Sequence, residues 1–363
     1  FKILSQYSPY YRAYYVNVDH VKQTAPQEVT FYCKDKGVRE MAVILCDLVV
    51  LPKHWWTGKD AQGHQRDITK PTLEIPLGCG PYKIASVVPG KSIVWERVKD
   101  YWGKDFPQNV GRNNYGIIKY NYLRDENASW EAFKKGNVSD YRQEKSIQRW
   151  MQQYTFPAFT SGHVKKIGYP HPAQGWSAYY FNTRKPKFAD IRVRKALFLA
   201  LDFDSMNRAI YFGKYRRFDS YYGHLNLSAR GLPDAEELKY LNLVKDQVPA
   251  ELFTKPMEWP HYFTPLQRRA NMKAAIELLE SAGYHLVNNR LIGKDGKQLS
   301  VEFLLSTIRP YEEQPTALYV ASLKRLGIDA QIRKVDQAQF LNRAINYDYD
   351  VVLQLVKQSN SPG

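Results

Sequence analysis

The sequence predicts an α/β fold in two lobes, on three observations. The chain has 363 residues, whereas a single hydrophobic core usually stops growing near about 250 residues. Strand-like and helix-like segments alternate over residues 300–355, as in a parallel sheet with crossover helices. A segment with two prolines, Tyr169 to Gly175, separates this region from a first half rich in short strands. We therefore expect lobe one at residues 1–172, lobe two at 173–355, and the start of a return crossover to lobe one at 356–363.

The first half of the chain is predicted to consist of short strands and turns, because short apolar runs lie between Gly, Pro and Asn clusters. These runs are Val29 to Cys33, Tyr82 to Val88, Ile93 to Val98 and Ile117 to Tyr122. We expect one helix among them, Ala128 to Lys135, ended by Gly136, because glycine tolerates the left-handed conformation of a helix end. The glycines in Gly78 to Lys83, GCGPYK, lack the following helix of a phosphate loop, so this segment is predicted to be a strand-edge turn.

The second half begins with a predicted strand, Trp176 to Phe181. Asp190 can cap a following helix, and Gln267 to Ala282 is a second helix ended by Gly283.

The last segment shows the clearest pattern, which is βαβαβ. Its successive elements are Val301 to Leu305, Pro315 to Leu326 ended by Gly327, Ile328 to Ile332, Gln337 to Asn346 capped by Asp336, and Asp350 to Leu355. Strands joined in this way pair in parallel. Ligands bind beyond the carboxyl ends of such strands, which here means near Ser306 to Arg309, Val335 to Asp336 and Val356 to Asn360.

Charge and hydropathy narrow the class of protein. The formal net charge of +16 favours acidic partners. The basic residues form only short groups, so nucleic acid is not an expected partner. The high net charge nevertheless leaves a basic envelope or nucleic-acid-binding module as an alternative function. No apolar stretch reaches the roughly 20 residues that span a bilayer, and Phe1 to Tyr15 has no signal-peptide pattern.

Motifs of catalysis and metal binding are missing from the sequence. His54 and the three cysteines, Cys33, Cys46 and Cys79, do not have the spacing of zinc ligands. A nucleophile elbow is missing too, and carboxylates such as Asp350 fall on turns or helix starts. We expect no enzyme, cofactor or metal, with a peptide or glycan hydrolase as a weaker alternative. The cysteines either include a Cys33–Cys46 bridge or are unpaired buried thiols.

Aromatic and polar residues gather on either side of the predicted domain crossing. They are Trp176, Tyr179, Tyr180, Asn182 and Arg184, followed by Asp219, Ser220, Tyr221 and Tyr222. Stacking surface combined with hydrogen-bonding groups suits a peptide-like ligand, so we predict ligand contacts here. The alternative is that these side chains only pack the lobe.

Three segments resemble the bacterial extracellular solute-binding proteins of family five, which include oligopeptide, dipeptide and nickel receptors. They are Trp176 to Gly213 with its Asn-Thr and Arg-Lys-Ala-Leu motifs, GCGPYK at Gly78, and KAAIELLESAGY at Lys273 to Tyr284. The resemblance implies a two-lobe periplasmic-binding-protein-like fold of type II, cluster C. Family members are longer, which implies that this chain is truncated at both ends and that its lobe one is incomplete.

Further segments are similar to the YejA-type receptors of this family, which serve peptide and microcin C uptake. They are Asp219 to Pro233, Asp246 to Thr254, Val335 to Arg343 and the closing SNSPG. The similarity implies a monomeric periplasmic component of an ABC transporter, which captures oligopeptide-like solutes by lobe closure and delivers them to permease and ATPase subunits. Oligopeptide receptors hold the peptide amino group with an Asp just past the last strand. The nearest position here is Ser359, which we include among the expected contacts.

Overall fold

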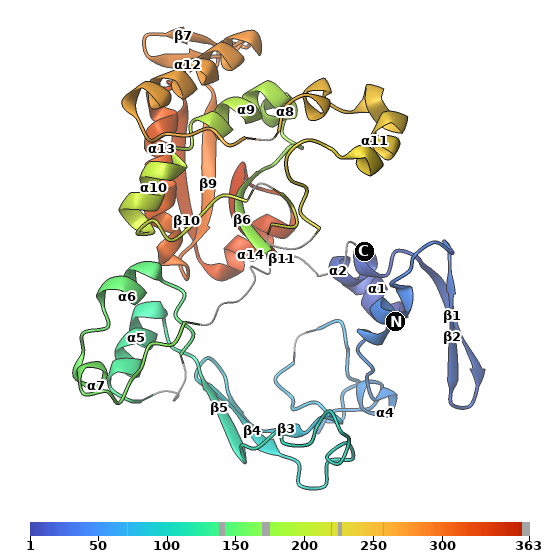
Figure 1. Cartoon of the computed structure of the whole chain (residues 1–363). Coiled ribbons are helices and arrows are strands. Elements are labelled where there is room, and N and C mark those ends of the chain that lie inside the picture. Colours follow the sequence, from blue (N-terminus) through green and yellow to red (C-terminus); the bar gives the residue numbers. More distant parts are fainter. Residues whose placement is uncertain are drawn as a thin grey trace. The chain divides into compact units, whose positions relative to one another are not determined.

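The computed structural model describes residues 1–70, 72–137, 142–168, 175–218, 220–223, 227–256 and 258–357. The chain divides into two compact units, Phe1–Arg124 and Asp125–Pro362 (Figure 1). Residues 125–168 therefore belong to the second compact unit, although the sequence prediction assigns them to lobe one. The lobe boundary at residue 172 stays a prediction.

The strands of the first unit form two small antiparallel sheets. β1 (Val18–Ala25) pairs with β2 (Glu28–Cys33) as a hairpin. β3 (Tyr82–Val88), β4 (Ser92–Arg97) and β5 (Ile117–Asn121) follow one another in a three-stranded sheet. All four strands predicted for this region are confirmed, and the turn at Gly78 to Lys83 leads into β3 as expected.

The prediction of a single helix within residues 1–172 is wrong. The structure has seven helices among the described residues of this region: α1 (Lys2–Tyr7), α2 (Pro9–Tyr14), α3 (Met41–Cys46), α4 (Lys53–Trp56), α5 (Glu126–Lys134), α6 (Ile147–Gln152) and α7 (Pro157–Thr160). Only α5 was predicted, and Gly136 follows it with a φ of 71°. The other six have four to six residues each, which is too short for an apolar repeat at helical spacing to be recognised.

A four-stranded sheet forms the centre of the second unit, with the order β10-β9-β11-β6 (Figure 1). β9 (Ser300–Ser306) pairs in parallel with both β10 (Asp329–Val335) and β11 (Val351–Lys357). β6 (Gly175–Phe181) pairs antiparallel with β11. The predicted βαβαβ arrangement is confirmed, and β11 extends two residues past its predicted end.

Helices cover both faces of this sheet. One face, carrying Val301, Phe303 and Val351, packs in a large core with residues of five helices, namely α8 (Pro186–Ala189), α9 (Ile191–Leu199), α10 (Phe203–Ile210), α12 (Pro265–Ser281) and α13 (Glu313–Arg325). The other face, carrying Leu304 and Val352, packs against Phe340 of α14 (Gln337–Ile345). Successive residues of one strand serve different cores because strand side chains alternate between faces.

The predicted helix boundaries have the local chemistry that the sequence suggests. Asp190 accepts a hydrogen bond from the backbone N of Arg192 at 2.8 Å, and Asp336 accepts one from that of Gln339 at 2.9 Å. Gly283 and Gly327 follow α12 and α13 with φ values of 94° and 81°, which a residue with a Cβ adopts only at a cost.

The remaining described elements lie outside the sheet. They are α11 (Ala235–Leu241), the 3₁₀ helices η1 (Asn242–Gln247), η2 (Ala250–Phe253) and η3 (Pro310–Glu312), and the hairpin of β7 (His285–Val287) and β8 (Arg290–Ile292). Within the described ranges, every helix is too short or too polar to cross a membrane.

The three cysteines are free and exposed. The expectation of buried thiols is therefore wrong, because each cysteine lies at a strand or helix end or in a loop and not in a core.

Candidate ligand-binding site

The register of β6 against β11 decides where the predicted site residues lie. Trp176 is opposite Val356, near the end of β11, and Phe181 is opposite Val351, at its beginning. Since β11 is parallel to β9 and β10, Trp176 lies at the carboxyl edge of the parallel strands, where ligands of α/β sheets bind. Asn182 lies about 20 Å away at the opposite edge, because a strand rises about 3.3 Å per residue.

Three aromatic side chains, Trp176, Tyr180 and Tyr221, form what we call the edge cluster. The ring centroids of Trp176 and Tyr180 are 5.7 Å apart, and those of Trp176 and Tyr221 are 5.6 Å apart. Trp176 and Tyr180 lie on the same face of β6 because they are four residues apart in a strand. The Tyr221 side chain is 72% exposed. The Trp176 and Tyr180 rings are tilted against each other and the Tyr221 ring meets that of Trp176 edge-on, so the cluster presents aromatic surface next to solvent at Tyr221.

The inner members of the edge cluster carry polar atoms that lack partners. Among the described residues, Trp176 Nε1 and Tyr180 Oη are buried and form no hydrogen bond. Tyr180 packs beside Leu304 and Val352. Burial raises the pKa of the Tyr180 hydroxyl, and the neighbouring Tyr221 raises it further, so Tyr180 is a protonated donor at neutral pH.

Tyr179 lies on the opposite face of β6 and packs in the large core. Its ring contacts Phe303 and Tyr319 with centroid separations of 5.6 and 5.2 Å. Its hydroxyl is 3.0 Å from Thr316 Oγ1, which itself donates to a backbone carbonyl. Burial raises the pKa of Tyr179 well above its usual value. These contacts fit the packing alternative left open by the sequence.

Asn182 and Arg184 lie together at the other edge of the sheet. The Asn182 side chain donates to the carbonyl oxygens of Tyr347 and Tyr349 at 2.8 and 3.0 Å, and accepts from the backbone N of Arg184 at 3.2 Å. The Arg184 guanidinium lies 3.6 Å from the centroid of the Tyr347 ring. The structure therefore does not bring these two residues together with the edge cluster.

The other predicted contacts come from the turn after α10 and from the end of the chain. The Ser220 hydroxyl accepts a hydrogen bond from the backbone N of Tyr222 at 3.2 Å, and both residues are half-buried. Asp219 and Ser359 lie outside the described residues.

Sequence reasoning missed a buried carboxylate at the carboxyl edge of β9. Glu312 is 7% exposed, and its Oε1 is 3.4 Å from Arg309 Nη1. Burial raises the pKa of Glu312, while Arg309 lowers it. In the sequence this residue is part of an ordinary acidic helix start, so only the structure shows its burial.

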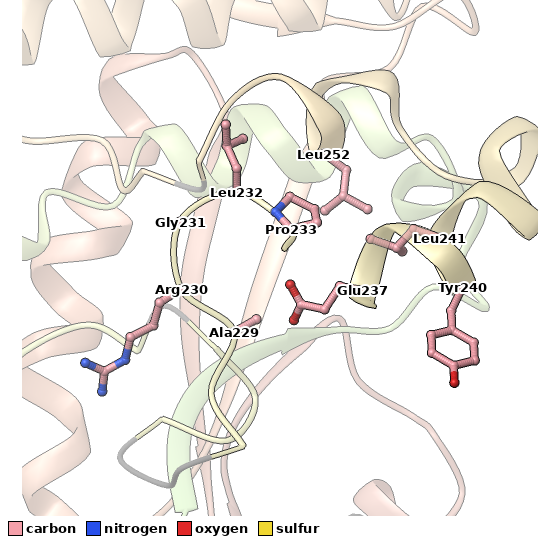
Figure 2. A pocket seen from close by; sticks show the side chains of 9 residues that line it. All are labelled: Ala229, Arg230, Gly231, Leu232, Pro233, Glu237, Tyr240, Leu241 and Leu252. Carbon is pink, nitrogen blue, oxygen red and sulfur yellow. The ribbon is translucent and has the colours of Figure 1, made fainter. Parts of the chain in front are cut away.

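A shallow apolar cavity of ≈ 400 Å³ lies between residues 229–233 and the segment of α11 and η2. Figure 2 shows Leu232, Pro233 and Leu252 around it, whereas the Arg230 side chain points away from them. The sequence analysis did not predict this cavity. Within the described part of the chain, no group of three or more His, Cys, Asp or Glu residues could hold a metal ion.

A comparison with solved structures identifies the fold. The structure is similar to that of the oligopeptide-binding protein AppA from Bacillus subtilis in complex with a nonapeptide, with a TM-score of 0.69 at 19% sequence identity over 96% of this chain and 60% of AppA. This likeness confirms the predicted periplasmic-binding-protein-like α/β fold.

The family follows from the sequence comparison. The family model of bacterial extracellular solute-binding proteins, family 5, matches residues 2–362. The chain belongs to this family of solute-binding proteins.

Two curated relatives match nearly the whole chain. The uncharacterized protein y4wM of Sinorhizobium fredii is 42% identical over 98% of this chain and 54% of its own length. The probable peptide-binding protein YejA of Agrobacterium fabrum is 40% identical over 98% of this chain and 58% of its own length. The resemblance to YejA-type proteins is thereby confirmed, and the chain spans a little over half the length of these relatives.

Proposed function

We propose that this chain is part of a periplasmic substrate-binding component of an ABC transporter and captures oligopeptide-like solutes. The observation that carries the proposal is the edge cluster, an aromatic cluster with an exposed Tyr221 and half-buried Trp176 and Tyr180 at the carboxyl edge of a parallel sheet in a family 5 fold. The name of the Agrobacterium fabrum relative and the nonapeptide bound to AppA support a peptide as the ligand class.

The proposed mechanism is binding without chemical conversion. Aromatic rings offer flat stacking area at a low cost in side-chain entropy, and adjacent polar atoms fix the orientation of the ligand. Closure of two lobes over the solute would produce the form that a permease and its ATPase recognise. The component acts as a monomer and needs no cofactor or metal.

We place the ligand against Trp176, Tyr180 and Tyr221, with Tyr222 and Ser359 as flanking contacts. In the proposal Tyr179, Asn182 and Arg184 do not contact the ligand. They fix β6 against its neighbouring elements, Tyr179 from the opposite face of the strand and the other two residues from its far end. The core packing of Tyr179 and the bonds of Asn182 to the turn before β11 support that division.

The proposal is tested by calorimetry of the purified chain with a pool of random pentapeptides. We expect saturable binding that Tyr221→Ala weakens by about two- to tenfold, the range that corresponds to one aromatic contact. Tyr240→Ala is the matched control, because this tyrosine of α11 is 71% exposed against 72% for Tyr221, and it should leave the affinity unchanged. Absence of binding, or recovery of cleaved peptides by mass spectrometry, would overturn the proposal.

A further inference from the structure

We propose that Trp176 Nε1 and Tyr180 Oη donate hydrogen bonds to oxygen atoms of the bound solute, so that the edge cluster selects a ligand that offers acceptors at this position. The oxygens can belong to an internal peptide carbonyl or to the terminal carboxylate. The inference rests on the proposed function and extends it from a stacking surface to a defined hydrogen-bonding specificity.

The first step of the argument is the cost of the two unpaired groups. A buried polar group without a partner destabilises a fold, and such groups are rare in native structures. Nine buried side-chain atoms without a hydrogen bond occur among the described residues, and two of them lie on neighbouring rings of one strand face, whose centroids are 5.7 Å apart. An indole N–H can only donate, so its missing partner must be an acceptor.

The second step is the contrast with buried tyrosines that serve packing alone. Tyr319 donates to the carbonyl oxygen of Leu197 at 2.7 Å, and Tyr262 donates to that of Leu199 at 2.6 Å. In both cases the fold supplies an acceptor from an adjacent helix. At Tyr180 no described residue does so, which leaves the hydroxyl available to a ligand.

The third step concerns access to these atoms. The Tyr221 ring contacts that of Trp176, and its side chain is largely exposed. An exposed side chain changes rotamer on the picosecond to nanosecond timescale. Tyr221 can therefore turn aside for a ligand and then stack on it without any change in the sheet.

The test compares Tyr180→Phe and Trp176→Phe, each of which removes a donor and keeps an aromatic ring, with Tyr319→Phe as the control. Thermal unfolding of the free chain and calorimetry with the random pentapeptide pool are measured for each variant. Tyr180→Phe and Trp176→Phe should weaken peptide binding by about five- to tenfold. Tyr180→Phe should leave the melting temperature of the free chain unchanged or higher, because it removes an unpaired group. Tyr319→Phe should lower the melting temperature and leave peptide affinity unchanged.

Two further arms identify the source of the acceptor. Peptide pools with free and with amidated carboxyl ends are compared. An equal loss of affinity with both pools assigns the donors to internal carbonyls, and a loss of affinity with the free-acid pool alone assigns them to the carboxylate.

Variant affinities within twofold of the wild type overturn the inference while the proposed function stands. If the wild type binds no peptide, the proposed function fails. A lower melting temperature of free Tyr180→Phe would also overturn the inference, because the hydroxyl would then have a partner within the chain.

Discussion

Replacement of Asp350 by Asn tests how the central sheet is held at its amino edge. The Asp350 side chain is 8% exposed and lies 3.0 Å from Lys185 Nζ and 2.5 Å from Lys187 Nζ. It also accepts a hydrogen bond from the backbone N of Glu302 at 2.9 Å. One carboxylate thus joins the segment around α8 to the beginnings of β9 and β11.

The size of the effect follows from what the substitution leaves behind. Loss of one partner from a buried ion pair costs about 3–5 kcal/mol. Lys185 and Lys187 are 37% and 24% exposed, so water solvates part of the charge that remains. An Asn side chain can still accept from Glu302. We therefore expect Asp350→Asn to lower the free energy of unfolding by about 2–3 kcal/mol.

The ion pairs of Asp350 with Lys185 and Lys187 also predict that the free energy of unfolding depends on pH. Burial raises the pKa of Asp350, but hydrogen bonds from Lys187, the Glu302 backbone and Lys185 together outweigh burial and lower it below the usual value. The carboxylate therefore stabilises the fold above a pH of about 4. This contribution is lost as the pH falls through the lowered pKa, so the difference between wild type and variant should shrink there.

The assay is urea unfolding of the full chain followed by near-ultraviolet circular dichroism at pH 7 and pH 3. Asp348→Asn is the matched control, because Asp348 is 65% exposed and pairs with a single arginine, and exposed pairs contribute about 0–1 kcal/mol. If Asp350→Asn changed stability no more than Asp348→Asn, the reasoning about this edge of the sheet would be refuted.

Two other substitutions test the packing of the second unit by the same unfolding measurement. Glu144→Gln should cost about 2–3 kcal/mol, because Glu144 is 2% exposed and Arg149, which is 9% exposed, would lose a buried charge partner; an unchanged midpoint would contradict this. Gly327→Ala should cost about 2–3 kcal/mol, since φ is 81° and an added Cβ would lie 2.9 Å from the backbone N of Leu291. Gly296→Ala, with φ of 73° and open space around it, should cost only about 1 kcal/mol, and equal losses would refute the steric argument.

The sequence predicted helix ends and strands best where the residues that determine them are close together along the chain. The caps at Asp190 and Asp336 and the glycines after α12 and α13 lie within a turn of the helix ends that they define, so no tertiary information is needed. Alternation of Val301, Phe303 and Leu305 identified β9 for the same reason. The short helices of the first unit were missed because four to six residues contain too little of a repeat.

The candidate site was predicted only in part. Alternation along a strand already separates Tyr179 from Tyr180, but the sequence does not say which of the two faces is closed by helices. The structure shows that the large helical core closes the face of Tyr179. Tyr180 faces the smaller core beside Trp176.

The sequence by itself determined the family, the strands β2 to β6 and the parallel βαβαβ unit, because these depend on motifs and on periodicities along the chain. Only the tertiary structure decided that Trp176 and Arg184 lie at opposite edges of the sheet, and that Tyr221 joins Trp176 from a distant turn. The physical reason is that β6 pairs antiparallel with β11, and the register of this long-range pairing fixes which end of β6 reaches the carboxyl edge.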